Sequence, residues 1–172
     1  MRKVCYSVVS SLDGFIAGPN GEADWIPVNP EVDFEALYDR FDTLLVGRVT
    51  FESMLRAGRT NVPGMKTVVL SRTLRQEEHP TVTIRADAIE TTRALRNAEG
   101  KDAWLFGGGV LFRTLLTAAL VDLVEITIAP ALLGSGIPLL SPPSTGARLV
   151  LESHRTYAST GLVRLNYRVA AA

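Results

Sequence analysis

Three consecutive glycines, Gly107, Gly108 and Gly109, follow an apolar run and precede a helical pattern. A glycine run costs chain entropy on folding. A backbone that wraps a diphosphate at a helix N-terminus offsets that cost. The run matches neither the GxGxxG dinucleotide fingerprint nor the GKS/GKT end of a P-loop. A plain packing turn, the alternative, rarely needs all three glycines, so the sequence favours a phosphate-binding turn.

A second junction of this kind contains Gly47, Arg48 and Thr50 after the apolar segment 43–46. The glycine permits close approach of a ligand, and the following helix start offers free N–H groups and a positive dipole end. Arg48 and Thr50 add a cation and a hydroxyl donor that suit a phosphate. The alternative is a tight turn with a surface arginine and a threonine helix cap, and these residues by themselves leave both open.

The third candidate is the strand end Leu70, Ser71 and Arg72. Strands often end in serine or arginine, so this segment is weak evidence when it stands alone. Combined with the two glycine junctions, a hydroxyl and a fixed guanidinium favour a phosphomonoester over a free ribose diol.

The elements that would position these junctions alternate β-rich and helical segments, a pattern typical of α/β layered domains. We expect strands at 3–10, 43–46, 66–71, 81–85, 103–106 and 123–129. We expect helices at 32–41, 50–55, 87–100 and 111–119. Segments 147–153 and 162–169 predict a final antiparallel pair, because apolar and polar residues alternate along the second. The sequence predicts one domain over 1–172.

Composition excludes several classes of function. The 18 Lys and Arg residues balance 18 Asp and Glu residues, and no block of like charge predicts binding to nucleic acid or membrane. The single cysteine, Cys5, lies in an apolar run that predicts a buried, inert thiol and no cysteine-based metal site. His79 and His154 have no partners at metal-binding or catalytic spacing, so we expect surface histidines. Without a signal-peptide pattern, we expect a cytoplasmic protein.

Four ordered motifs resemble the dihydrofolate reductase-like superfamily: SLDGFIAG at 11–18, GRVTFE at 47–52, VVLSR at 68–72 and FGGGVLF at 106–112. The resemblance is strongest to the reductase domain of riboflavin biosynthesis, the RibD C-terminal domain, and its stand-alone relatives. The late segment 130–139 also resembles that branch. The match covers nearly the whole chain. It implies a three-layer α/β/α fold with a mixed, mainly parallel twisted sheet and a C-terminal antiparallel hairpin.

The resemblance also implies cofactor-binding residues, with NADPH as the cofactor. Gly47, Arg48 and Thr50 match the motif that binds its phosphates, and Leu70, Ser71 and Arg72 match the segment that holds the adenosine end and 2′-phosphate. Ile16 and Ala17 match the mobile loop beside the nicotinamide. The family's glycine-rich turn, which lies under the pyrophosphate of the cofactor, corresponds here to Phe106, Gly107, Gly108, Gly109, Val110 and Leu111.

The substrate side is less well defined by the sequence. Folate-reducing members carry a carboxylate on the first helix, but the spacing after Trp25 is longer here and none of the acidic residues there matches clearly. A solvated acidic helix start is the alternative. Asp13, Trp25 and Asp33 are the candidates for substrate contact or catalysis.

These observations predict an NADPH-dependent reductase of a small pteridine-, pyrimidine- or ribityl-type substrate. The alternative is a non-catalytic NADPH-binding module of the same fold. Apolar residues in the last strands, with few helices left to cover them, also predict a homodimer.

Overall fold

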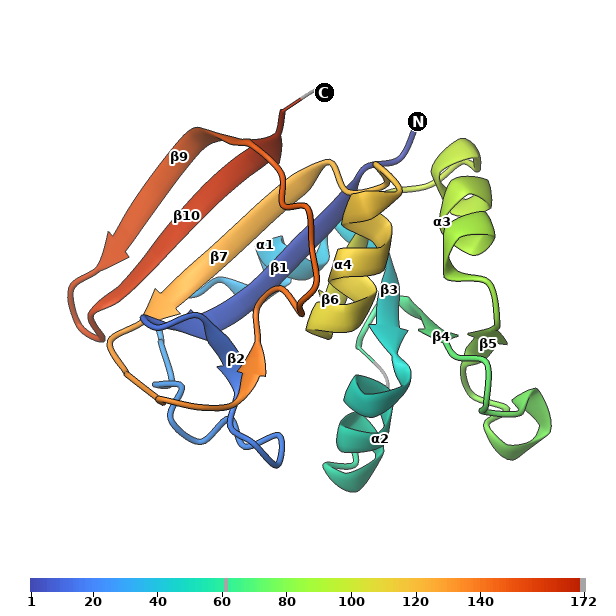
Figure 1. The fold of residues 1–172 in the computed structure, drawn as a ribbon, viewed down its shortest axis with the longest axis horizontal. Helices are drawn as coiled ribbons and strands as arrows, with labels where there is room; N and C mark the ends of the chain where they lie inside the picture. Colours follow the sequence, from blue (N-terminus) through green and yellow to red (C-terminus); the bar gives the residue numbers. More distant parts are fainter. Residues whose placement is uncertain (61, 171–172) are drawn as a thin grey trace.

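The computed structural model describes residues 1–60 and 62–170, and its centre is an eight-stranded sheet (Figure 1). The strand order is β5-β4-β3-β6-β1-β7-β10-β9. The strand bounds are β1 Val4–Ser11, β3 Phe41–Gly47, β4 Lys66–Leu70, β5 Thr83–Arg85, β6 Asp102–Gly107, β7 Leu123–Ala129, β9 Leu149–Tyr157 and β10 Leu162–Val169. A separate antiparallel pair joins β2, Phe15–Ala17, to β8, Ile137–Pro138.

The sheet is parallel from β5 to β7 and antiparallel from β7 to β9. The predicted C-terminal hairpin is therefore confirmed. Leu165 faces Ile126 of β7, and Asn166 faces Glu125. Because neighbouring side chains of a strand point to opposite faces, one face of β7 and β10 is apolar and the other polar.

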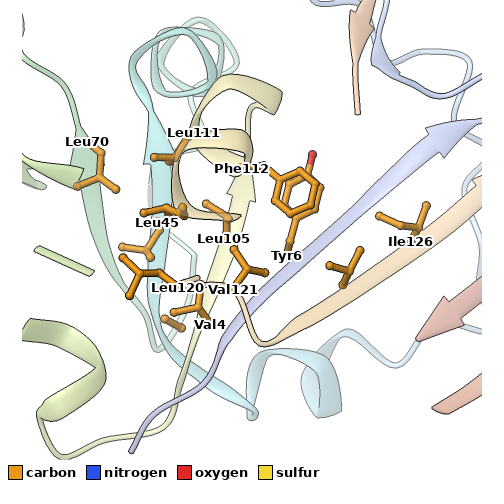
Figure 2. Packing of buried hydrophobic residues seen from close by; sticks show 13 residues of the cluster. Val4, Tyr6, Leu45, Leu70, Leu105, Leu111, Phe112, Leu120, Val121 and Ile126 are labelled. Carbon is orange, nitrogen blue, oxygen red and sulfur yellow. The ribbon is translucent and has the colours of Figure 1, made fainter. Parts of the chain in front are cut away.

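The helices are α1 Phe34–Tyr38, α2 Arg48–Arg56, α3 Ala88–Asn97 and α4 Gly109–Thr117, with a short 3-10 turn at Gln76–Glu78. Side chains of α3 and α4 pack on one face of the sheet, where Leu115 is fully buried. The rings of Tyr6 and Phe112 stack there with centroids 3.8 Å apart (Figure 2). None of the helices in the described residues is long and apolar enough to cross a membrane.

The opposite face of the sheet is covered by α1 and α2. Phe51 and Met54 of α2 pack with Trp104 and Cys5, and Tyr38 of α1 joins the same cluster. Helices on both faces give the predicted three layers (Figure 1). The buried position of Cys5 agrees with the prediction of an inert thiol, because burial and the neighbouring Glu125 carboxylate raise its pKa.

Several element bounds differ from those predicted. Helix α1 is shorter because Asp33 caps its start and Phe41, assigned to the helical pattern, is a buried residue of β3. Strand β9 begins two residues later and ends four residues later than the predicted 147–153. The β2–β8 pair was not predicted, since strands of three and two residues carry no detectable alternation.

The two histidines differ in their surroundings. His154 is exposed, as predicted. His79 lies at the surface as predicted, but it is only partly exposed, and its ring packs edge-on against Phe51 with 5.1 Å between the centroids. An aromatic partner distant in sequence places this loop against α2.

Candidate functional site

The two glycine junctions lie side by side at the carboxyl ends of β3 and β6, where the chain continues toward opposite edges of the sheet. Strands β3 and β6 are parallel neighbours, but α2 leaves β3 on one face and α4 leaves β6 on the other. The chain then continues to β4 on one side and to β7 on the other (Figure 1). Open α/β sheets bind ligands in the crevice that such a divergence leaves at the carboxyl ends of the strands.

Backbone approach at this crevice is close. Val46 is paired with Gly107, and a Cβ added to Gly47 would lie 3.8 Å from both the Gly107 oxygen and the Gly108 nitrogen. The Thr50 hydroxyl lies 3.4 Å from the position that a Cβ on Gly107 or Gly108 would take. The Gly107–Gly108 peptide bond is cis. The structure therefore brings Gly47, Thr50 and the glycine turn together.

Both helices at the crevice begin without a side-chain cap. Gly47 is the N-cap of α2 and Gly108 the N-cap of α4, and neither can supply a capping oxygen. The first N–H groups of each helix are thus available to an anion. Val110 in the first turn of α4 is 59% exposed, whereas Leu111 is buried against the core.

Gly109 differs from its two neighbours because it is buried against another part of the chain. A Cβ there would overlap the carbonyl oxygen of Pro138 and lie 2.8 Å from the Ser141 hydroxyl. The Ser141 N–H also donates to the Gly109 oxygen at 3.4 Å. Packing alone therefore requires glycine at 109, while Gly108 is half-buried and borders the crevice.

Arg48 is exposed in the first turn of α2 and pairs with Glu52, four residues later, at 2.8 Å. An exposed pair of this kind contributes little to stability. A bound phosphate can therefore compete with Glu52 for the guanidinium at small cost.

The three residues at the strand end 70–72 have different surroundings. The Ser71 hydroxyl is buried and accepts from the Thr73 and Leu74 N–H groups at 3.2 and 3.1 Å, which forms the turn. Leu70 is buried in the core. Arg72 is exposed, and its guanidinium has no ion pair within residues 1–60 and 62–170. Of the three residues, Arg72 is the one placed to meet an anion.

The predicted nicotinamide loop forms strand β2. Ile16 and Ala17 are half-buried there, and Ala17 pairs with Ile137 of β8. Since Pro138 of β8 also contacts Gly109, β8 links the loop to the glycine turn.

Each of the three substrate-side candidates is already hydrogen-bonded to a different part of the chain. The Asp13 carboxylate accepts from the N–H groups of Leu133 and Gly134. The Trp25 indole donates to the Glu22 backbone oxygen at 3.1 Å. Asp33 caps α1 by accepting from the Ala36 N–H at 2.9 Å. Their contact with a substrate remains a prediction.

A sequence profile of the RibD C-terminal domain family matches residues 2–163. The chain belongs to this family.

Two relatives of this RibD C-terminal domain come from Bacillus subtilis strain 168. The uncharacterized protein YyaP is 32% identical over 178 aligned residues, which cover 96% of this chain and 94% of YyaP. The uncharacterized protein YwjB is 30% identical over 172 residues, covering 96% of this chain and 97% of YwjB. These relatives support the family without indicating a substrate.

Solved structures confirm the dihydrofolate reductase-like fold. A protein of Shewanella sp. PV-4, assigned provisionally to riboflavin biosynthesis, superposes with a TM-score of 0.81 at 28% identity, over 99% of this chain and 100% of that one. Dihydrofolate reductase from Enterococcus faecalis, solved with NADP(H), superposes with a TM-score of 0.75 at 20% identity. The superposition covers 98% of this chain and 97% of the reductase. A Thermotoga maritima pyrimidine deaminase/uracil reductase gives 0.71 at 17% identity, over 98% of this chain and 57% of that one.

A row of aromatic side chains in this RibD C-terminal domain was not predicted. It runs from Phe34 to Tyr38 on α1, then to Trp104 and Phe106 on β6, with successive ring centroids 5.4–6.1 Å apart. Phe34 is 53% exposed and Phe106 is 38% exposed. Phe106 directly precedes Gly107, so the row joins the crevice to α1. The spacing of Phe34 and Tyr38, four residues apart, was the available signal.

A buried ion cluster lies on the same sheet face, toward β10. Glu125 of β7 is buried and accepts from Arg40 and Arg164. Burial alone raises the pKa of the Glu125 carboxyl, but the two guanidiniums outweigh it and hold the pKa below its usual value. Arg40 and Arg164 also line a depression of about 220 Å³ beside α1. The sequence carries no signal for this cluster, because Arg40 and Arg164 are 85 and 39 residues away from Glu125 in the chain.

Proposed function

We propose that this RibD C-terminal domain is an NADPH-dependent reductase acting on a small heterocyclic substrate of the pteridine, pyrimidine or ribityl-linked type. One observation carries the proposal: the glycine junctions of β3 and β6 adjoin at the point where α2 and α4 leave on opposite faces. Two uncapped helix starts then point their N–H groups toward one crevice.

The residues at the crevice fit the phosphates of a dinucleotide. A side chain at Gly108 would project toward the Thr50 hydroxyl and narrow the opening. Arg48 and Arg72 supply exposed cations at the ends of neighbouring strands. Bound NADPH would supply a hydride, while this chain binds its phosphates, orients the nicotinamide and presents the substrate.

A preference for NADPH over NADH is part of the proposal and is supported by Arg72. Arg72 lies just after the end of β4, and β4 is separated from β6 in the sheet by β3 alone. An exposed guanidinium forms charge-assisted hydrogen bonds with a phosphomonoester that a ribose hydroxyl cannot match.

The proposed substrate site is the aromatic row beside Phe106. A flat heterocycle can stack on exposed aromatic rings. Phe106 is next to Gly107, so a ring stacked there would lie close to the cofactor crevice.

A non-catalytic NADPH-binding module is the second candidate, and one observation favours it. Asp33, the acidic residue at the start of α1, is engaged as the helix cap. Proton delivery would then depend on another group or on water.

Binding and catalysis can be tested separately. We expect NADPH to raise the melting temperature more than NADH does at equal concentration. We expect NADPH oxidation with at least one member of a panel of oxidised pteridines and pyrimidines. Binding without turnover across the panel would favour the non-catalytic module, and the absence of any NADPH effect would contradict both candidates.

A further inference from the structure

The turn between β1 and β2 is tied to the loop between β7 and β8 by the carboxylate of Asp13. The Gly134 N–H donates to Asp13 Oδ2 at 2.7 Å, and the Leu133 N–H lies 3.1 Å from both carboxylate oxygens. The Leu12 N–H donates to the Ala131 oxygen at 2.8 Å and strengthens the same junction. Segments 120 residues apart in the chain thus meet at one exposed side chain.

Ser11 connects this carboxylate to the start of β2. Its buried hydroxyl donates to Asp13 Oδ1 at 2.6 Å and accepts from the Phe15 N–H at 2.9 Å. The Ser11 hydroxyl, followed by the N–H groups of Gly134 and Leu133, lowers the pKa of the Asp13 carboxyl. Asp13 is consequently an ionised acceptor at neutral pH.

Strand β8 transmits this attachment to the glycine turn. Phe15 pairs with Pro138, and Ala17 pairs with Ile137. A Cβ on Gly136 would overlap the Ala17 carbonyl oxygen, so β2 and β8 are closely packed. On its other side β8 reaches Gly109, where the Pro138 oxygen leaves no room for a Cβ. Strand β8 therefore lies between β2 and the start of α4 (Figure 1).

We propose that Asp13 is a positioning residue, which fixes β2 so that Ile16 and Ala17 contact the nicotinamide end of the dinucleotide. This inference rests on the proposed function. It assigns Asp13 a task away from the substrate, because both carboxylate oxygens already accept from Ser11, Leu133 and Gly134. In this positioning role Asp13 acts through the β2 backbone rather than through its own contact with substrate or cofactor.

The inference predicts a selective loss of affinity in Asp13→Asn. The amide keeps the size of the side chain, but it removes the charge and one acceptor. If β2 of the variant takes its correct position only about a tenth of the time, the apparent dissociation constant for NADPH rises about tenfold over that of the wild type. The test ligand is NADPH, and the comparison ligand is 2′-phosphoadenosine 5′-diphosphate, which lacks the nicotinamide. Isothermal titration should show the tenfold loss for NADPH and an unchanged dissociation constant for the fragment.

Two further variants test the route of the effect. Ser11→Ala removes the hydroxyl that joins Asp13 to Phe15, so it should reproduce the selective loss. The double variant should lose less than the product of the two single effects, because both act on one network. Glu22→Gln is the matched control: this exposed carboxylate accepts only from Asn20 within the described residues, and its replacement should leave both affinities unchanged.

Hydrogen exchange supplies a measurement independent of the ligand. Asp13→Asn should speed amide exchange at 15–17 and 133–138 while leaving β4 unchanged. Equal losses of both ligands, no loss of either, or unaltered exchange at β2 would overturn the positioning role. A wild-type protein that binds neither ligand would overturn the proposed function and the inference with it.

Discussion

Arg40 donates to both carboxylate oxygens of Glu125, with Nη1 3.0 Å from Oε2 and Nη2 2.5 Å from Oε1. Arg164 donates to the same carboxylate at 2.5 Å. The Glu125 side chain is 7% exposed, whereas those of Arg40 and Arg164 are 37% and 21% exposed. Loss of the carboxylate would leave two guanidiniums facing each other without a shared counter-charge.

Glu125→Gln should therefore lower the free energy of unfolding by about 2–3 kcal/mol, below the full cost of breaking a buried pair because water screens the arginines. Urea denaturation at pH 7 measures this loss. The control is Glu152→Gln, whose partner Arg168 lies 3.7 Å away with both side chains about half exposed. That variant should lose less than about 0.5 kcal/mol. Equal losses would contradict the special role of the buried cluster.

The same carboxylate should make stability depend on pH. The folded pKa of Glu125 lies below its unfolded value of about 4.3, so its contribution is complete above that value and disappears as pH falls through the folded pKa. We expect urea midpoints of the wild type to fall more steeply than those of Glu125→Gln below about pH 4.5. Parallel curves for the two proteins would show that other carboxyls dominate acid unfolding.

Arg72→Ala should weaken NADPH binding about ten- to a hundredfold and hardly change NADH binding, because a charge-assisted contact contributes about 1.5–3 kcal/mol. Fluorescence titration with both cofactors gives the ratio. Arg75, three residues later and also exposed, provides the control through Arg75→Ala. Equal losses of NADPH and NADH in Arg72→Ala would show that Arg72 does not contact the 2′-phosphate.

Substitutions at Gly108 and Gly109 should have different effects. Gly108→Val should remain folded and lose most dinucleotide binding, because the site borders the crevice. Gly109→Ala should destabilise the protein by roughly 1–3 kcal/mol, because the added Cβ meets the Pro138 backbone. Thermal denaturation and NADPH titration separate the two effects. A Gly108→Val protein that unfolds, while its folded fraction binds normally, would favour a packing role for the turn.

We also propose a homodimer through the edge strand β9. Leu149, Val150 and Leu151 are 42%, 39% and 50% exposed there. Two-fold antiparallel pairing about Val150 would place Leu149 beside the Leu151 of a second copy. Sedimentation at micromolar concentration should show a dimer, and Leu151→Glu should yield a monomer. A wild-type monomer mass independent of concentration would remove this proposal.

Local sequence patterns were sufficient for much of the fold. The alternation along 162–169 predicted β10. The helix predicted at 87–100 is α3, and the Asp87 side chain caps its start by accepting from the Glu90 N–H at 2.9 Å. The two glycine junctions were identified for the same reason, since strand end, glycine and helix start are consecutive in the chain. Their adjacency in the sheet, β3 beside β6, depends on topology that no local pattern encodes.

The tertiary structure alone decided what each candidate side chain contacts. The sequence made Asp13 a candidate for substrate contact, and only the structure shows that two N–H groups of the distant loop at 133–134 donate to its carboxylate. In the sequence Gly109 cannot be distinguished from Gly107 and Gly108, whereas in the structure it alone packs against the Pro138 backbone. The sequence by itself determined the order of elements, because backbone propensity and hydrophobic periodicity act over a few residues. Contacts between distant segments arise only when the sheet and its loops assemble, so they decided which residues form the site.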